Sequence, residues 1–176
     1  MRRAVFLDRD GVINRIVFRS GKPCSPRNIS EFEILVGVSD VLACFREAGF
    51  LNIVITNQPD ISRGLMDVQE LESMHKRLRE MLPVDDVLVC PHGDRDGCSC
   101  RKPKPGMLLA AAQKWGLDLQ GSFVIGDQWK DVAAGKDAGC TTILVDYPHN
   151  RDTQVDYRAG SLAEAVQYIL NDGAKR

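Results

Sequence analysis

No run of apolar residues in this sequence approaches the roughly 18 that a helix needs to cross a bilayer. The amino terminus has two arginines, but only four apolar residues follow before Asp8, too few for the apolar region of a secretion signal. The charges nearly cancel, with 23 basic against 24 acidic residues, so no broad field favours nucleic acid or an anionic membrane. We therefore expect a cytoplasmic protein with no nucleic-acid or membrane partner.

Cysteine is also scarce, with six in 176 residues. In a reducing compartment, clustered cysteines more often bind a metal or act chemically than form disulfides. With 44% hydrophobic residues, the chain is long enough to bury one core and too short for two ordinary domains. We predict a single domain over residues 1–176 and a monomer.

Short, continuously apolar runs recur along the chain and predict strands that are covered on both faces, as in a parallel sheet. These runs are 4–8, 51–57, 84–90, 122–127 and 141–146. Helical periodicity is found at 38–48, 67–81, 105–115, 129–138 and 161–170. This alternation predicts an α/β fold with a doubly wound, mainly parallel sheet and no large cap domain. Two irregular segments, 14–36 and 90–104, are candidate inserts that face the substrate.

Acidic and polar residues stand where the predicted strands end. In such folds, ligands bind beyond the carboxyl ends of the strands. The residues that we expect to meet at this rim are Asp8, Asp10, Thr56, Asn57, Asp127 and Asp131. Clustered carboxylates repel one another unless a hard cation holds them, and Mg²⁺ usually leaves positions free for water and phosphate. The sequence therefore predicts a Mg²⁺ site that accepts a phosphate.

The two aspartates of "DRDG" could divide the work of phosphoryl transfer. One would attack phosphorus as a carboxylate nucleophile, and the other would give a proton to the leaving oxygen and later take one from water. Each motif alone is weak, because "DG" is a common turn signal. A calcium loop is excluded, since its glycine would fall five residues after the first aspartate and Gly11 falls three after Asp8. Only the ordered set of strand ends predicts a catalytic site.

In order along the chain, "FLDRDG", "ITN", "RKPKPGM" and "VIGDQWKD" resemble the four motifs of the haloacid-dehalogenase (HAD) superfamily of phosphatases. The resemblance extends from Leu7 to about Asp146. The longer strings "DRDGVIN" and "TNQ" followed by "RG", with a Cys/His loop directly before "RKPKPGM", resemble the D-glycero-D-manno-heptose 1,7-bisphosphate phosphatases. The histidinol-phosphate phosphatases are close relatives that share the zinc loop.

The resemblance implies a role for each matching catalytic position. Asp8 would be the nucleophile that forms an aspartyl-phosphate, and Asp10 the general acid/base. Asp8, the backbone carbonyl of Asp10 and Asp127 would hold Mg²⁺. Lys102 would neutralise charge on the phosphate and the nucleophile. The phosphoryl oxygens would be bound by Thr56 and Asn57.

The same resemblance implies where the substrate binds. Arg101 would reach the second phosphate, because a guanidinium can grip phosphate through two hydrogen bonds. Arg63 and Asn14 are the other expected substrate-binding residues, and Asp131 would orient groups around the metal. The first insert adds candidates for contacts with the sugar or its distal phosphate, namely Arg19, Lys22, Pro26 and Arg27.

One stretch departs from the family pattern. Between Gln58 and Arg63 the chain reads "PDIS", where the family has a small, glycine-containing stretch of the type Ser-Gly-Ile-Ala. Pro59 stiffens the backbone and Asp60 adds a negative charge beside a site for anions. The details of substrate fit and the preferred anomer therefore stay open.

The resemblance implies a Mg²⁺-dependent phosphatase that converts D-glycero-D-manno-heptose 1,7-bisphosphate to the 1-phosphate. Histidinol phosphate is the alternative substrate for the same chemistry. The alternative from another class is a catalytically silent, zinc-bearing binding domain. Against it stands the reactive side chain at every catalytic position named above.

Cys90, His92, Cys98 and Cys100 offer three thiolates and one imidazole, a set suited to tetrahedral zinc. The spacing Cys-x-His-x5-Cys-x-Cys is tighter than the usual Cys-x2-Cys knuckle, but the resemblance supports zinc. Four protein ligands leave no open position, so this zinc would be structural. Because the loop 90–100 has few apolar residues with which to pack, we expect the zinc to hold Arg101 and Lys102 over the phosphate pocket.

Two other histidines give little signal. His75 lies in "ELESMHKRLREML", whose charges predict a solvated helical face. His149 lies in "DYPHN", which predicts a surface loop. Neither is expected to act in the site.

Overall fold

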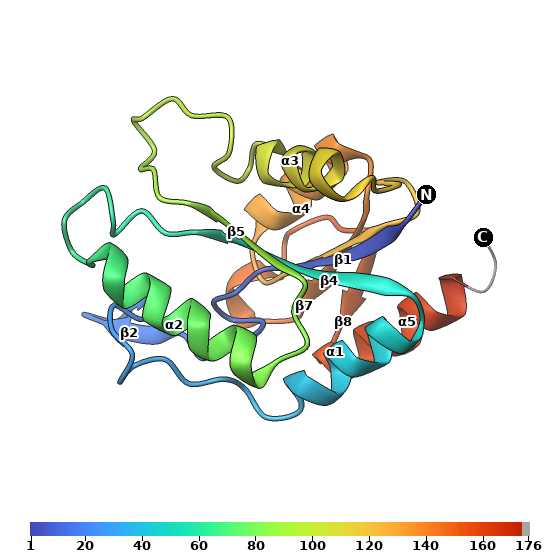
Figure 1. Ribbon diagram of the computed structural model, residues 1–176, viewed down its shortest axis with the longest axis horizontal. Helices are drawn as coiled ribbons and strands as arrows, with labels where there is room; N and C mark the ends of the chain where they lie inside the picture. Colours follow the sequence, from blue (N-terminus) through green and yellow to red (C-terminus); the bar gives the residue numbers. More distant parts are fainter. Residues whose placement is uncertain (174–176) are drawn as a thin grey trace.

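The computed structural model describes residues 1–173 of the chain. Its main sheet contains β1 (Arg3–Leu7), β4 (Phe50–Asn57), β5 (Asp86–Cys90), β6 (Phe123–Gly126), β7 (Thr141–Val145) and β8 (Tyr157–Ala159). The strands are parallel and lie in the order β5-β4-β1-β6-β7-β8 (Figure 1). Most residues of the central strands β1, β4 and β6 are buried, which explains their continuously apolar sequences.

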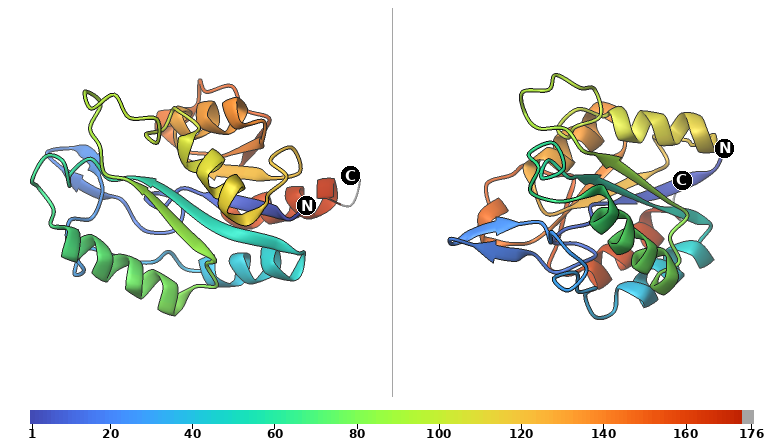
Figure 2. Two further views of the ribbon diagram at one scale, coloured as in Figure 1. Left: turned by 45° about the horizontal axis from the view of Figure 1, so that its top comes forward. Right: turned by 60° about the vertical axis from the view of Figure 1, so that its left-hand side comes forward.

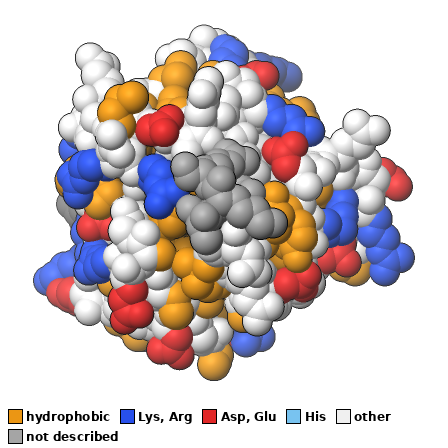
Figure 3. Space-filling view, turned by 90° about the vertical axis from the view of Figure 1, so that its right-hand side faces the viewer, with side chains coloured by type: hydrophobic (Ala, Val, Ile, Leu, Met, Phe, Trp, Pro, Cys, Tyr) orange, Lys and Arg blue, Asp and Glu red, His pale blue; other side chains and the backbone are white. Residues whose placement is uncertain are grey.

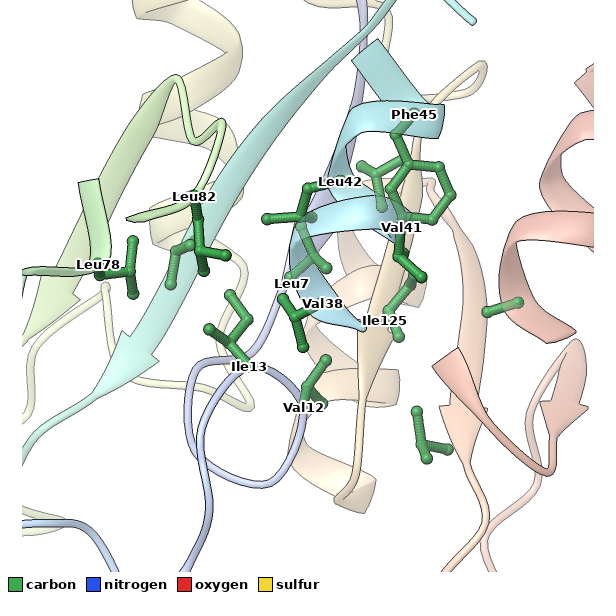
Figure 4. Close-up of a cluster of buried hydrophobic side chains, with 14 of the residues drawn as sticks. Leu7, Val12, Ile13, Val38, Val41, Leu42, Phe45, Leu78, Leu82 and Ile125 are labelled. Carbon is green, nitrogen blue, oxygen red and sulfur yellow. The ribbon is translucent and has the colours of Figure 1, made fainter. Parts of the chain in front are cut away.

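Helices cover both faces of the sheet. One face carries α1 (Val38–Glu47), α2 (Val68–Met81) and α5 (Leu162–Gly173), and the other carries α3 (Gly106–Trp115) and α4 (Trp129–Ala138) (Figure 2). Leu42 and Phe45 of α1 are fully buried and pack toward Leu7 and Ile125 of the sheet (Figure 4). Burying each such side chain contributes roughly 1.5–3 kcal/mol. The predicted doubly wound α/β fold is confirmed.

The strand order reverses beside β1, and this position creates the crevice in which ligands bind in such sheets. From β1 the chain continues to β4 on one side, whereas β6 and β7 are added on the other. Asp8 follows β1 directly, Asn57 ends β4, and Asp127 follows β6. The backbone N–H of Asp8 donates to the carbonyl of Ile125 at 2.9 Å, which ties the first loop to β6.

The insert 14–36 is more regular than its sequence indicates. It contains an antiparallel hairpin of β2 (Val17–Arg19) and β3 (Lys22–Cys24). The two residues that connect them, Ser20 and Gly21, have φ angles of 50° and 74°, the left-handed pair typical of a tight hairpin turn. Three-residue strands carry too little periodicity to be recognised, and β8 and the short 3-10 helix Pro148–Asn150 were missed for the same reason.

The predicted solvated position of His75 is wrong. Its side chain is only 1% exposed, because it shares the buried stripe of α2 with Leu71, Met74 and Leu78. The charged residues around it face solvent on the rest of the helix. His149 lies in the short 3-10 helix and is exposed, as predicted for a surface segment.

The surface agrees with the balanced composition. At the α5 end of the molecule, basic and acidic side chains are interspersed between separate apolar patches (Figure 3). Over residues 1–173, no helix combines the length and apolarity required to cross a membrane.

Candidate active site

Three aspartates meet at the carboxyl ends of β1 and β6, as the strand order predicts. One carboxylate oxygen from each of Asp8, Asp127 and Asp131 lies within 4.8 Å of the others. Asp127 is fully buried, and within the described chain neither of its carboxylate oxygens accepts a hydrogen bond; the nearest basic group to them is Nε2 of His149, 3.5 Å from Oδ2. A buried carboxylate without a hydrogen-bond donor is costly, and oxygen ligands are those that Mg²⁺ prefers. The cluster therefore fits a magnesium ion.

The crowding of these carboxylates changes their acidity. Burial, with the charge of Asp131 adding to it, raises the pKa of Asp8 to about 7. Burial, with the charge of Asp8 adding to it, raises the pKa of Asp127 to about 8. A bound divalent cation would favour the ionised carboxylates and offset both effects.

Two glycines make room for this cluster. A Cβ atom at Gly11 would lie 2.7 Å from Oδ2 of Asp127, and Gly11 has a φ angle of +89° that other residues rarely adopt. A Cβ atom at Gly126 would lie 2.2 Å from the Cβ of Asp131. Glycine is therefore required at both positions for the aspartates to approach.

Lys102 supplies the positive charge of the cluster. Its Nζ lies 2.9 Å from Oδ1 of Asp8 and 2.6 Å from Oδ1 of Asp131, and it donates to the carbonyl of Ile55 at 3.0 Å. Burial alone would lower the pKa of Lys102, but Asp131 and Asp8 outweigh it and raise that pKa above its ordinary value. Lys102 is therefore a permanent cation beside Asp8.

The polar end of β4 supports these charges through hydrogen bonds. The side-chain amide of Asn57 donates to the carbonyl of Lys102 at 3.0 Å and accepts from its N–H at 3.1 Å. The next side chain, Gln58, is fully buried and donates to Oγ1 of Thr56 at 2.8 Å. Asn57 lines the pocket, whereas Thr56 is 1% exposed.

Asp10 is surrounded by hydrogen-bond donors. Asn14 and Gln58 each donate to its carboxylate at 2.9 Å, and Arg9 forms an ion pair with it at 2.9 Å. Burial alone would raise the pKa of Asp10, but the charge of Arg9 and hydrogen bonds that include one from Ser25 lower it below the ordinary value. Asn14, predicted to bind substrate, is fully buried instead, because its amide is turned inward to Asp10.

A pocket of about 310 Å³ opens over Asp8 and Asp10. Arg63, Arg101 and Lys130 contribute positive charge to its wall. Arg63 and Arg101 are the two arginines predicted to bind substrate, and both line this pocket. Lys130 was not singled out from the sequence, although its place in "GDQWKD", three residues after Asp127, is a usable signal.

The insert reaches this pocket through residues other than those predicted. Pro23, Cys24 and Ser25 line it. The guanidinium of Arg19 instead pairs with Glu31 inside the insert, and Lys22 is exposed at the turn of the hairpin. Pro26 is buried.

Asp60, the charge that departs from the family pattern, is neutralised by two arginines. Its carboxylate accepts from Nε of Arg27 at 2.8 Å and from Arg63 at 3.3 Å. The carboxylate is thus used to join the insert to the loop after β4.

Cys90, His92, Cys98 and Cys100 lie together at the end of β5, with ligand atoms within 4.8 Å of one another. The Sγ of Cys90 lies 3.1 Å from that of Cys100 and 3.7 Å from that of Cys98, and Nδ1 of His92 lies 3.3 Å from the Sγ of Cys100. Tetrahedral zinc with bonds of about 2.0–2.3 Å requires separations of roughly 3.5–3.8 Å. The Cys90–Cys98 pair has this separation, and the two contacts of Cys100 are shorter by a few tenths of an ångström. The convergence of three thiols and one imidazole is the ligand set of a structural zinc site with no open position.

The loop also holds the first basic residue of "RKPKPGM". Arg101 donates from Nε to Oδ1 of Asp94 at 2.9 Å and from Nη1 to the carbonyl of His92 at 3.1 Å. Its side chain is only 11% exposed. The position of Arg101 thus depends on the backbone of the Cys/His loop.

Comparisons with known proteins agree with the site. The HAD-hydrolase-like family model matches residues 99–172. The chain is 38% identical over 149 residues to the D-glycero-beta-D-manno-heptose-1,7-bisphosphate 7-phosphatase of Pseudomonas aeruginosa, covering 82% of this chain and 81% of the relative. It is 36% identical over 158 residues to the D-glycero-alpha-D-manno-heptose-1,7-bisphosphate 7-phosphatase of Burkholderia mallei, covering 81% and 79%.

A solved structure of a heptose bisphosphate phosphatase has the same fold as this chain. The D,D-heptose 1,7-bisphosphate phosphatase of Bordetella bronchiseptica, crystallised with magnesium and phosphate, superposes with a TM-score of 0.83 at 31% sequence identity. The match covers 97% of this chain and 99% of that one. The resemblance stated from the motifs is confirmed, and the chain belongs to the heptose-1,7-bisphosphate 7-phosphatase family of HAD-like hydrolases.

Proposed function

We propose that this protein is a Mg²⁺-dependent phosphatase that removes the 7-phosphate of D-glycero-D-manno-heptose 1,7-bisphosphate and leaves the 1-phosphate. The observation that carries this proposal is the cluster of Asp8, Asp127 and Asp131, in which the Nζ of Lys102 contacts Asp8 and Asp131 at the floor of a basic pocket. The names of the relatives in both sequence and structure support the substrate.

The chemistry assigns different tasks to the two aspartates of the first loop. A carboxylate oxygen of Asp8 attacks phosphorus, and the bond from phosphorus to the sugar oxygen breaks. Asp10 must first take up a proton, because its pKa is lowered in the absence of substrate, and it then gives that proton to the sugar oxygen. Asp10 then takes a proton from water as the water attacks phosphorus, and inorganic phosphate leaves Asp8. Lys102 stabilises the negative charge that both steps gather near Asp8.

Asp8, Asp127 and the backbone carbonyl of Asp10 would hold Mg²⁺, which supplies positive charge against the phosphate and the clustered carboxylates. Asp131 contacts Lys102 and accepts from the backbone N–H of Gln128 at 3.0 Å. Its role in this proposal is to orient the lysine. Asn57 would contact the phosphoryl oxygens from the end of β4. Thr56, which was also predicted to do so, is buried beneath the pocket and accepts from Gln58 instead.

The rim of the pocket would bind the rest of the substrate. Arg63, Arg101 and Lys130 form a basic wall that suits a second phosphate. A structural zinc ion in the Cys/His cluster would fix Arg101 in this wall and Lys102 beside Asp8. Residues 1–176 would act as one domain and as a monomer. Zinc-ligating cysteines are typical of the reducing cytoplasm, which is the proposed location.

A panel of phosphate-release assays with Mg²⁺ tests the proposal. It compares the two anomers of the heptose bisphosphate with histidinol phosphate and fructose 1,6-bisphosphate. The highest kcat/KM is expected with a heptose bisphosphate, and Asp8→Asn should abolish release. A preference for histidinol phosphate would replace the substrate, and turnover by Asp8→Asn would remove the assigned nucleophile. No release from any substrate would favour a binding protein.

A further inference from the structure

Arg9 lies between the two aspartates of the first loop, and its side chain is fully buried. Its Nε donates to Oδ1 of Asp10 at 3.0 Å and its Nη2 donates to Oδ2 at 3.2 Å. A guanidinium in this geometry contacts both carboxylate oxygens through a rigid fork. Arg9 therefore determines how the carboxylate of Asp10 is turned.

The remaining side of Arg9 contacts a helix that is distant in sequence. Nη1 of Arg9 lies 3.1 Å from Nε2 of His75 in α2, and His75 is 1% exposed. Arginine has N–H groups but no acceptor, so Nε2 of His75 must accept. Burial, with the charge of Arg9 adding to it, lowers the pKa of His75 to about 3. The ring is consequently neutral at neutral pH, with its proton on Nδ1.

This arrangement is not the one that packing alone would favour. Nδ1 of His75 is buried and, in the described part of the chain, has no hydrogen-bond partner. An unpaired buried N–H is unfavourable. Leucine would fit the apolar stripe of α2 beside Met74 and Leu78 without that cost. What the imidazole provides and leucine cannot is the acceptor for Arg9.

We propose that Arg9 and His75 are positioning residues for the general acid/base, with His75 holding the guanidinium of Arg9 and Arg9 holding the carboxyl group of Asp10 toward the leaving oxygen. The inference rests on the proposed phosphatase function. Asp10 lines the pocket, whereas Arg9 and His75 do not, so both act through Asp10. The guanidinium carbon of Arg9 also lies over the ring of Phe32, 5.5 Å from the ring centre.

Substrates with different leaving groups separate this role from a merely structural one. A sugar oxygen needs a proton as its bond to phosphorus breaks, whereas p-nitrophenolate leaves without one. Because kcat/KM reports the steps up to the first phosphoryl transfer, His75→Leu should lower it at least about tenfold for the heptose bisphosphate. For p-nitrophenyl phosphate the loss should stay within about threefold. His75→Gln, whose side-chain oxygen can accept from Arg9, should recover most of the loss.

Two further variants complete the test. Leu78→Ala removes a fully buried side chain of the same helix, so it should lower stability while the ratio of the two kcat/KM values stays as in the wild type. Arg9→Lys keeps the positive charge but loses the two parallel hydrogen bonds to Asp10. It should lower kcat/KM for the heptose bisphosphate more than for p-nitrophenyl phosphate, and it tests the inference if His75→Leu does not fold.

An unchanged ratio in folded Arg9→Lys or His75→Leu would overturn the inference. An equal change of the ratio in Leu78→Ala would overturn it as well. Failure of the wild type to hydrolyse the heptose bisphosphate would count against the proposed function alone, because the ratio can then be measured with any other alkyl phosphate that the protein hydrolyses.

Discussion

The side-chain amide of Asn57 and the backbone of Lys102 form two hydrogen bonds, 3.0 and 3.1 Å long. They join the end of β4 to the basic segment that follows the Cys/His loop. As a result, the Nζ of Lys102 is held between Asp8 and Asp131. A residue predicted to bind phosphate therefore also fixes the cation of the site.

Asn57→Ala removes both hydrogen bonds. We expect kcat/KM to fall about 10- to 100-fold, because displacement of a catalytic group by about an ångström has effects of this size. The free energy of unfolding should fall by only about 1–3 kcal/mol. Asn57→Asp can accept from the N–H of Lys102 but cannot donate to its carbonyl. Its kcat/KM should therefore lie between that of the wild type and that of Asn57→Ala. A wild-type rate in Asn57→Ala would contradict this role.

Gly11→Ala should weaken magnesium binding. The added Cβ would meet Oδ2 of Asp127 at 2.7 Å and displace that carboxylate. We expect the Mg²⁺ concentration for half-maximal activity to rise at least about tenfold, equivalent to about 1.4 kcal/mol. Gly49→Ala is the matched control, since Gly49 has a φ angle of +84° and nothing within 4 Å of an added Cβ. An equally raised Mg²⁺ requirement in Gly49→Ala would show that backbone strain alone is responsible. A wild-type Mg²⁺ requirement in Gly11→Ala would contradict the predicted clash with Asp127.

The stability of the metal-free protein should depend on pH through Asp127. Its carboxyl group titrates at 3.8 in the unfolded chain and at about 8 in the folded one. Between these values the folded state holds the proton more tightly, so the free energy of unfolding falls as pH rises from about 4 to about 8. Asp8 acts in the same sense, whereas His75, with its pKa lowered to about 3, acts in the opposite sense up to about its ordinary value of 6.5.

Comparison with Asp127→Asn isolates the contribution of that residue. In a chelator, urea unfolding at about pH 5 and about pH 8 should show that the wild type loses at least about 1 kcal/mol more than the variant. Saturating Mg²⁺ should reduce the loss in the wild type, since the ion favours the ionised carboxylate. Parallel pH curves for the two proteins in chelator would be inconsistent with a raised pKa at Asp127.

Cys100→Ser should remove zinc and loosen the basic wall. Protein purified without added metal should contain about one equivalent of zinc by elemental mass spectrometry, and the variant much less. The variant should also unfold at a lower temperature and show a higher KM, because Arg101 is bonded to the loop. Cys44→Ser, at an exposed cysteine outside the cluster, should leave the zinc content, the unfolding temperature and the KM as in the wild type. Folded, active wild type without zinc would refute the structural role.

The strand ends could be predicted from the sequence because strand periodicity and parallel topology together place Asp8, Asn57 and Asp127 at one rim. The side-chain partners could not, since they depend on tertiary contacts. Asn14 turns inward to Asp10, and His75 is buried against Arg9 in spite of its charged neighbours. The pairing of Asp60 with two arginines has no local signal either.

The covalent step at Asp8 is the central claim, and trapping it is the most direct test. Protein turning over substrate with Mg²⁺ is quenched in acid, reduced with borohydride, digested and sequenced by mass spectrometry. Reduction converts an aspartyl-phosphate to homoserine, which we predict at position 8. Phosphate release without homoserine, or homoserine at another aspartate, would contradict the account.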